Sequence, residues 1–337
     1  MSRSHRYTAA AAAALALTVL PASVPFAPSA GAAVAAPARS QTRISTAFSL
    51  PGDRVYPEGI AADARTGDLY AASFADGTVF KRTPGRSAAE VFLPAGADGR
   101  RTANGLKVDR AGRLWVCDSS SGIAVYDTRT RRLLARFTVP GDGARFVNDV
   151  AIAPDGSAYI TDSSRAVVYR VTPRDLAAAA GGTAVLTPRF DLAAVLDPHA
   201  PTAFTLNGIV ADPAGRYLLV ADMTGADLYR LDTASGAIRK VALDGGDMLN
   251  ADGLELQNGR LWVVHNTDDT ISRWRIGRDG TTARKERQVT DASLQLPTTL
   301  ARLHGTLYVV RSQFDKGGPL GSGTPEIPFT IAAVRGL

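Results

Sequence analysis

Residues 103–118 read Ala-Asn-Gly-Leu-Lys-Val-Asp-Arg-Ala-Gly-Arg-Leu-Trp-Val-Cys-Asp: a polar residue, a short strand, a glycine turn and a second strand. The pattern occurs six times in the 337 residues, and its leading polar residues lie 46, 44, 59, 45 and 46 positions apart. Self-similarity at this period is typical of a β-propeller with one blade for each repeat. We therefore predict an all-β, six-bladed β-propeller with blade entrances at Glu58, Asn104, Asn148, Asn207, Asp252 and Thr298.

The two ends of the sequence are expected to share the last blade. The sixth repeat supplies three strands, the third of them at residues 328–334. Residues 46–51, Thr-Ala-Phe-Ser-Leu-Pro, resemble the fourth strands at residues 89–94 and 136–140. The N-terminal strand is therefore expected to complete the last blade, which leaves no long open sheet edge.

The N-terminus is typical of an export signal. A basic start at residues 3–6 precedes an Ala/Leu-rich run at 7–20, and Ala30-Gly31-Ala32 fits the small-x-small cleavage pattern. The apolar run is too short to span a membrane. We expect the mature protein to be secreted. The predicted segments are a signal peptide at 1–32, a disordered leader at 33–43 and the propeller at 44–337.

Composition narrows the classes of partner. The formal net charge is +6, and the arginines are scattered without a basic run, which argues against a nucleic acid partner. Cys117 is the only cysteine, so no internal disulfide forms, and its place on a strand favours an inert buried thiol. We expect a monomer without a membrane span that acts on a small molecule.

Four blade entrances carry oxygen donors suited to a metal ion. Glu58, Asn148, Asn207 and Asp252 are expected to point toward the propeller axis and to offer two carboxylates and two amide oxygens. Such all-oxygen sets suit Ca²⁺, which takes about 6–8 oxygen ligands, although ligand types alone leave Mg²⁺, Mn²⁺ and Zn²⁺ open. The alternative is that each Asn-Gly or Asp-Gly is a hairpin turn. Other residues supply the turns between the first two strands, so the metal interpretation is favoured.

The entrances, in the order Glu, Asn, Asn, Asp in blades 1, 3, 4 and 5, resemble the family of regucalcin (senescence marker protein), gluconolactonases and luciferin-regenerating enzyme. Paraoxonases and diisopropyl fluorophosphatase are similar in fold and ligand pattern. The resemblance covers about residues 45–337. It implies a divalent metal, usually Ca²⁺, at the top of the channel and hydrolysis of lactones or esters. It assigns the metal ligands to Glu58, Asn148, Asn207 and Asp252.

Two positions depart from the paraoxonase pattern. Asn104 stands where paraoxonases carry a histidine, and Gly59 stands where they carry an aspartate that binds a second, central calcium. Asp149 matches the other partner position of that calcium, but one ligand is poor support. We do not predict a second central metal.

The sequence favours an exported, metal-dependent hydrolase of lactones or esters. The cation would polarise the substrate carbonyl, and Asn104 and Asn148 would orient the substrate. Asp252 would act as general base or, in a phosphatase-like variant of the mechanism, as nucleophile. The alternative is a non-catalytic propeller that binds a ligand or protein on its top face. Further polar candidates on that face are the strand ends Asp118, Asp162, Asp222 and Asn266, the histidines His199 and His265, and the insertions 191–206 and 312–326.

Overall fold

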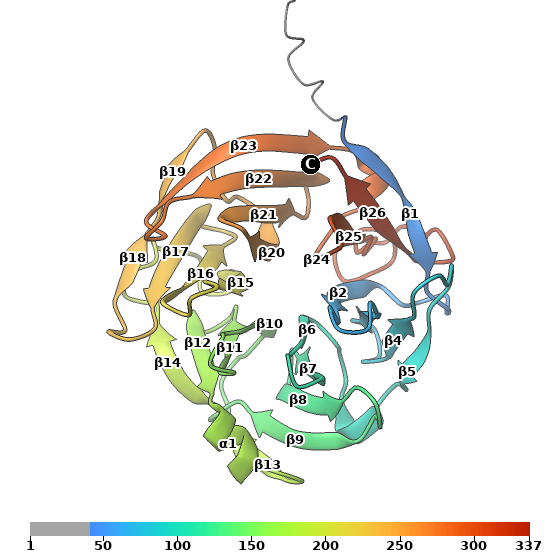
Figure 1. Ribbon diagram of the computed structural model, residues 1–337, viewed down its shortest axis with the longest axis horizontal. Helices are drawn as coiled ribbons and strands as arrows, with labels where there is room; N and C mark the ends of the chain where they lie inside the picture. The colour runs from blue at the N-terminus through green and yellow to red at the C-terminus, as the bar shows by residue number, and fades with distance from the viewer. Residues whose placement is uncertain (1–40) are drawn as a thin grey trace, which may run out of the picture. The chain divides into compact units, whose positions relative to one another are not determined.

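The computed structural model describes residues 41–337. Six mainly antiparallel sheets surround a central axis, and the innermost strand of each sheet lies at the hub (Figure 1). This arrangement confirms the six-bladed β-propeller. The predicted signal peptide and most of the predicted leader lie outside the described residues. The helices of residues 41–337 are all too short or too polar to cross a membrane.

From the hub outward, blade 1 consists of β2 (Pro57–Ala62), β3 (Leu69–Ser73), β4 (Val79–Arg82) and β5 (Glu90–Leu93). Blade 2 consists of β6 (Leu106–Val108), β7 (Arg113–Asp118), β8 (Gly122–Asp127), β9 (Leu133–Thr138) and β13 (Thr183–Val185). Blade 3 consists of β10 (Val147–Ile152), β11 (Ala158–Asp162), β12 (Val167–Val171) and β14 (Thr187–Asp191). Blade 4 consists of β15 (Leu206–Ala211), β16 (Tyr217–Asp222), β17 (Asp227–Asp232) and β18 (Ile238–Lys240). Blade 5 consists of β20 (Ala251–Gln257), β21 (Arg260–His265), β22 (Thr270–Ile276), β23 (Thr282–Thr290) and β19 (Ala242–Asp244). Blade 6 consists of β24 (Leu300–Leu303), β25 (Thr306–Val310), β26 (Thr330–Arg335) and β1 (Arg43–Ser49).

The N-terminal strand closes the ring as expected. β1 pairs antiparallel with β26, from Arg43 opposite Arg335 to Ser49 opposite Thr330. Just beyond β1, the amide of Leu50 donates to the carbonyl of Phe329 at 2.8 Å. The first and last strands of the described chain therefore share one sheet.

Two short parallel strands extend the outer edges of blades 2 and 5. β13, which follows β12 of blade 3 in the chain, pairs with β9 of blade 2. β19, which precedes the hub strand of blade 5, pairs with β23 of that blade. Both cover an otherwise unpaired sheet edge, and β13 also joins blade 3 to blade 2.

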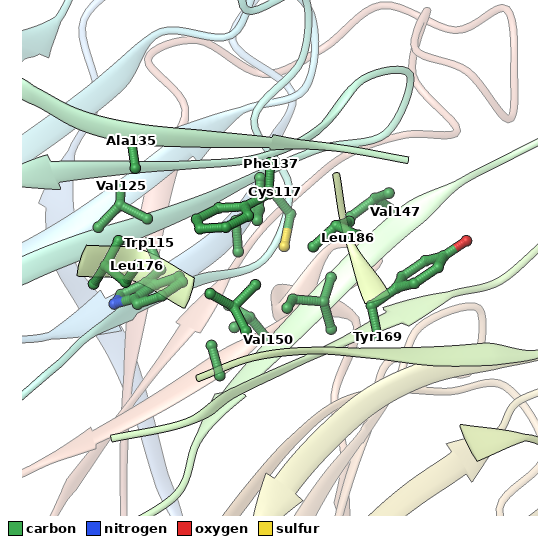
Figure 2. Close-up of a cluster of buried hydrophobic side chains, with 14 of the residues drawn as sticks. Trp115, Cys117, Val125, Ala135, Phe137, Val147, Val150, Tyr169, Leu176 and Leu186 are labelled. Carbon is green, nitrogen blue, oxygen red and sulfur yellow. The ribbon is translucent and has the colours of Figure 1, made fainter. Parts of the chain in front are cut away.

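The apolar core lies mainly between neighbouring blades. Between blades 2 and 3, Trp115, Phe137 and Val150 pack in one buried cluster with Cys117 (Figure 2). Because each sheet is covered on both faces, whole strands such as β3 and β16 are buried along their length. The thiol of Cys117 is buried, as the sequence predicted.

Helical structure is short. Helix α1 (Pro173–Ala178) has an N-terminus that is stabilised by a capping box between Thr172 and Asp175. Leu176 of this helix packs into the cluster between blades 2 and 3. Residues 41–337 also contain two 3₁₀ turns, η1 (Ala97–Gly99) and η2 (Ala292–Leu294).

Candidate functional site

The four predicted ligand positions share one backbone irregularity. The strand register shifts between Pro57 and Ile60, and equivalent shifts bracket the other three positions at 147–150, 206–209 and 251–254. Each shift is a bulge-like break in the pairing of a hub strand. Bulges re-aim side chains and are frequent next to functional sites. The residues inside these four breaks are Glu58-Gly59, Asn148-Asp149, Asn207-Gly208 and Asp252-Gly253.

The glycines at the entrances serve close packing of blades. Gly59, Gly105, Gly208 and Gly253 are not among the glycines with positive φ, so none adopts the backbone of a type I′ hairpin turn. A Cβ at Gly59 would lie 2.1 Å from the backbone oxygen of Asn104 in the next blade. A Cβ at Gly208 would lie 2.1 Å from the backbone oxygen of Asp252. The hairpin alternative is therefore wrong, because these glycines lack the positive φ of such a turn. At Gly59 and Gly208, only glycine allows the close contact between blades.

Hydrogen bonds link the entrances around the hub. The amide of Gly105 donates to the carbonyl of Asn148 at 2.9 Å, and the amide of Gly253 donates to the carbonyl of Thr298 at 2.7 Å. The hydroxyl of Thr298 then donates to the carbonyl of Glu58 at 2.7 Å, from the last blade to the first. These bonds and the glycine contacts bring residues about 240 positions apart in the sequence into one ring.

The ring presents buried oxygens without hydrogen-bond partners. They include Oε2 of Glu58, Oδ1 of Asn148 and Oδ1 of Asn207. The amide nitrogens of both asparagines are engaged, by Ser163 Oγ at 3.0 Å and by Met223 Sδ at 3.3 Å. Buried polar atoms are rarely left unpaired in proteins. Such oxygens in one ring are the donor set expected for a hard cation.

Ser163 fixes which end of Asn148 faces the site. Its hydroxyl donates to the carbonyl of Leu206, so its oxygen is left to accept from the amide nitrogen of Asn148. The carbonyl end of Asn148 must therefore point the other way. A side chain beyond the predicted set thus orients a predicted ligand.

Three buried carboxyl groups influence one another at the hub. Burial raises the pKa of Glu58 well above its usual value, and the charges of Asp252 and Asp149 raise it further. Burial also raises the pKa of Asp252 to about 7, against the opposing effect of Asn266 and Asn207. Burial raises the pKa of Asp149, while Lys107 lowers it. Burial and mutual repulsion therefore oppose full ionisation of these carboxyl groups in the absence of a positive charge.

Asp149 is a hub carboxylate outside the predicted ligand set. Its Oδ1 accepts from the amide of Val150 at 2.8 Å, and its Oδ2 accepts from the amide of Ile209 at 3.3 Å. Both oxygens therefore have backbone partners, unlike Oε2 of Glu58. The sequence signal was its match to one position of the central calcium site, which was too weak alone.

Asn104, predicted to contact substrate, lies at the same ring. Its side chain is fully buried, and both its oxygen and its nitrogen lack hydrogen-bond partners. An unpaired amide can both donate and accept. The amide of Asn104 therefore has hydrogen-bonding capacity that no neighbouring protein group uses.

Most other polar candidates have structural partners. Asp118, Asp162 and Asp222 accept from backbone amides two or three residues ahead, as turn-forming aspartates do. His199 bonds to Asp222 at 2.9 Å, and His265 bonds to the carbonyl of Leu249 and to Ser272. Asn266 differs, because its amide nitrogen donates to Oδ2 of Asp252 at 2.9 Å and so positions that carboxylate.

The four predicted ligands include only two charged side chains, Glu58 and Asp252. Within residues 41–337, no cluster of three or more histidine, cysteine, aspartate or glutamate side chains could hold a metal ion. The candidate set instead mixes carboxylates with neutral amide oxygens. This composition disfavours metals that prefer nitrogen or sulfur ligands and fits hard cations.

Solved structures share this fold at low sequence identity. A gluconolactonase from Xanthomonas campestris superposes with a TM-score of 0.59 at 17% identity, over 88% of this chain and 90% of that one. A luciferin-regenerating enzyme gives 0.61 at 16%, over 88% and 96%. The major allergen of Malassezia sympodialis gives 0.62 at 15%, over 85% and 95%. None of the curated proteins matches the sequence significantly.

A protein-family model gives a more specific assignment than these structures. The model of the SMP-30/Gluconolactonase/LRE-like region matches residues 56–285, which is more than half of the 337 residues. The match spans the bulged entrances Glu58, Asn148, Asn207 and Asp252. The chain therefore belongs to the SMP-30/gluconolactonase/LRE-like family.

Proposed function

We propose that this protein is a divalent-metal-dependent hydrolase of lactones or esters. The observation that carries the proposal is the ring of buried, unpartnered oxygens on Glu58, Asn148 and Asn207 beside the carboxylate of Asp252. The family match and the gluconolactonase among the similar structures support the reaction class.

The residues present fit a hard cation. Glu58, Asn148, Asn207 and Asp252 would hold it, and Ca²⁺ suits a set of carboxylate and amide oxygens best. Mg²⁺, Mn²⁺ and Zn²⁺ remain alternatives to be compared by titration. When bound, the cation would supply Lewis-acid polarisation of the substrate carbonyl.

Asp252 is the proposed general base. Its Oδ2 is held by Asn266 at 2.9 Å, which fixes the carboxylate and leaves its other oxygen to accept a proton. The carboxylate takes a proton from water as the water oxygen bonds to the carbonyl carbon. The ring C–O bond then breaks, and the leaving oxygen regains a proton to give the hydroxy acid.

Asn104 and Asn148 are the proposed substrate contacts. The buried amide nitrogen of Asn104 has unused donors, so it could donate to the substrate carbonyl oxygen, which would accept from a group that otherwise lacks a partner. Asn148 stands in the next blade, and its backbone is bonded to that of Gly105. The two side chains would thus fix the orientation of the carbonyl.

A lactone and ester panel tests the proposal. The protein is assayed with a chelator and then with Ca²⁺, Mg²⁺, Mn²⁺ or Zn²⁺ restored. We expect activity to disappear with chelator and to return with one of these cations. Asp252→Asn should abolish turnover, whereas Asp268→Asn, an exposed carboxylate on the same blade, should retain it. Absence of turnover under every condition would favour the non-catalytic alternative.

Export is part of the proposal and rests on the N-terminal sequence. Residues 1–32 carry the basic start, apolar run and cleavage pattern of a signal peptide. Expression of the full chain, fractionation and N-terminal sequencing test it directly. We expect the extracytoplasmic form to begin near Ala33. Full-length protein in the cytoplasm alone would contradict export.

A further inference from the structure

A row of four phenylalanines lies on the loops that flank the hub ring. The ring centroids of Phe314 and Phe74 are 5.4 Å apart, those of Phe74 and Phe146 are 6.3 Å apart, and those of Phe146 and Phe204 are 4.6 Å apart. The four residues come from blades 6, 1, 3 and 4 in that order. We call this set the phenylalanine row.

The row must lie near the propeller axis. Phe74 follows the second strand of blade 1, and Phe146 precedes the hub strand of blade 3. Blade 2 stands between these two blades in the ring (Figure 1). Side chains of non-neighbouring blades approach within 6.3 Å only where the blades converge, so these two rings lie at the hub.

The row is close to the proposed ligands along the chain. Phe146 stands two residues before Asn148, and Phe204 stands three residues before Asn207. The amide of Phe74 donates to the carbonyl of Tyr56, two residues before Glu58, at 3.2 Å. The loops that carry the row are therefore continuous with the strands that carry the oxygens.

The row is anchored but retains apolar surface. The amide of Phe146 donates to Asp162 at 2.9 Å, and the carbonyl of Phe204 accepts from the hydroxyl of Thr224. Phe74 and Phe146 are only partly buried, and Phe204 is 45% exposed. Fixed aromatic surface beside a polar site is what a ligand with an apolar part requires.

We propose that the phenylalanine row binds an apolar group of the substrate, so that the enzyme prefers lactones with an alkyl substituent over polyhydroxylated sugar lactones. The ester carbonyl would meet the polar ring while the alkyl chain lies along the row. This inference rests on the proposed hydrolase function and adds the class of substrate.

Three δ-lactones with the same ring chemistry test the preference. They are δ-valerolactone, which has no substituent, δ-decalactone, which adds a pentyl chain, and D-glucono-δ-lactone, which adds hydroxyl groups. Each methylene moved from water to an apolar surface adds about four-fold to binding. Since the row is partly exposed, we expect kcat/KM for δ-decalactone to exceed both others by at least about 10-fold. A higher kcat/KM for the glucono-lactone would overturn the inference.

Substitutions show whether the row carries the preference. Phe204→Ala and Phe146→Ala should each lower the ratio of kcat/KM for δ-decalactone over δ-valerolactone toward one, and Phe146→Leu should restore part of it. Val185→Ala, at an exposed apolar residue of β13 on the outer edge of blade 2, is the matched control and should leave the ratio unchanged. Equal losses for both lactones in the row variants would contradict the inference.

A binding assay separates this inference from the hydrolase proposal. The lactam 6-pentylpiperidin-2-one resembles δ-decalactone but resists hydrolysis, and its binding is measured by calorimetry beside unsubstituted piperidin-2-one. The pentyl compound should bind the wild type at least about 10-fold more tightly, and Phe146→Ala with Phe204→Ala should remove that difference. Equal affinity for the two lactams would overturn the role of the row, even in an active hydrolase. The same difference in a protein without turnover would uphold the row and refute the hydrolase.

Discussion

Replacing Asp252 by Asn is expected to stabilise the metal-free protein at pH 8 while it removes hydrolysis. In the folded protein, burial raises the pKa of this carboxyl from 3.8 to about 7. The folded state therefore binds the proton more tightly than the unfolded state. Stability is highest below the unfolded pKa, falls as pH rises from about 4 to 7, and remains reduced at pH 8.

The magnitude follows from the same shift. A difference of about 3 pKa units at about 1.4 kcal/mol each gives a penalty on the order of 4 kcal/mol at pH 8. Asn has the shape of Asp and no charge, and its carbonyl can still accept from Asn266. The variant should relieve much of this penalty, and the relief should vanish at pH 4.

Urea unfolding in chelator at pH 4 and pH 8 measures the effect. Asp162→Asn is the matched control, because this buried aspartate accepts from the amides of Phe146 and Ser164 and from the hydroxyl of Tyr169. Asn replaces one of the two acceptor oxygens of Asp162 by an NH₂ group, which cannot accept these bonds. Asp162→Asn should therefore destabilise the fold at pH 8. If Asp252→Asn also lowers the free energy of unfolding in chelator at pH 8, the electrostatic account of the hub is wrong.

Three further predictions concern the metal, the hub and the thiol. The rise in melting temperature caused by Ca²⁺ should grow from pH 5 to pH 8, because a proton on Asp252, whose pKa is about 7, competes with the cation. A rise independent of pH would contradict Asp252 as a metal ligand. Gly208→Ala should weaken Ca²⁺ binding at least about 10-fold by calorimetry, since its Cβ would lie 2.1 Å from the carbonyl oxygen of Asp252. Gly143→Ala, where the nearest atom is 3.6 Å away, is the control, and equal affinities in the two variants would exclude the packing argument. Burial and nearby carboxylates raise the pKa of Cys117 well above its usual value. A thiol reagent at pH 8 should therefore label the protein only after unfolding. Rapid labelling of the folded protein would be inconsistent with this burial.

Much of the fold could be predicted because its signals are local. The pattern in residues 103–118 predicted a short strand, a turn and a second strand, and the structure has the two strands at Leu106–Val108 and Arg113–Asp118. The likeness of residues 46–51 to other fourth strands sufficed to predict ring closure. The parallel strands β13 and β19 could not be predicted, because their pairing depends on neighbours already in place.

The candidate site was predictable only in part. The blade register identified Glu58, Asn148, Asn207 and Asp252, and the structure brings their entrances into one hub ring. The bulges that aim these residues are properties of strand pairing and leave no mark in one strand alone. The phenylalanine row could not be predicted from the repeat pattern, because its members occupy different positions in their repeats. Their relation exists only in three dimensions.

The pairing of β1 with β26 has a consequence for biosynthesis. Arg43 leaves the ribosome early, and its partner Arg335 is added 292 positions later. Until residues 330–335 are made, blade 6 lacks β26 and β1 has no partner strand. A chain that ends before β26 therefore cannot close the ring of blades. Such fragments, with unpaired strand edges, should be preferred targets of proteases.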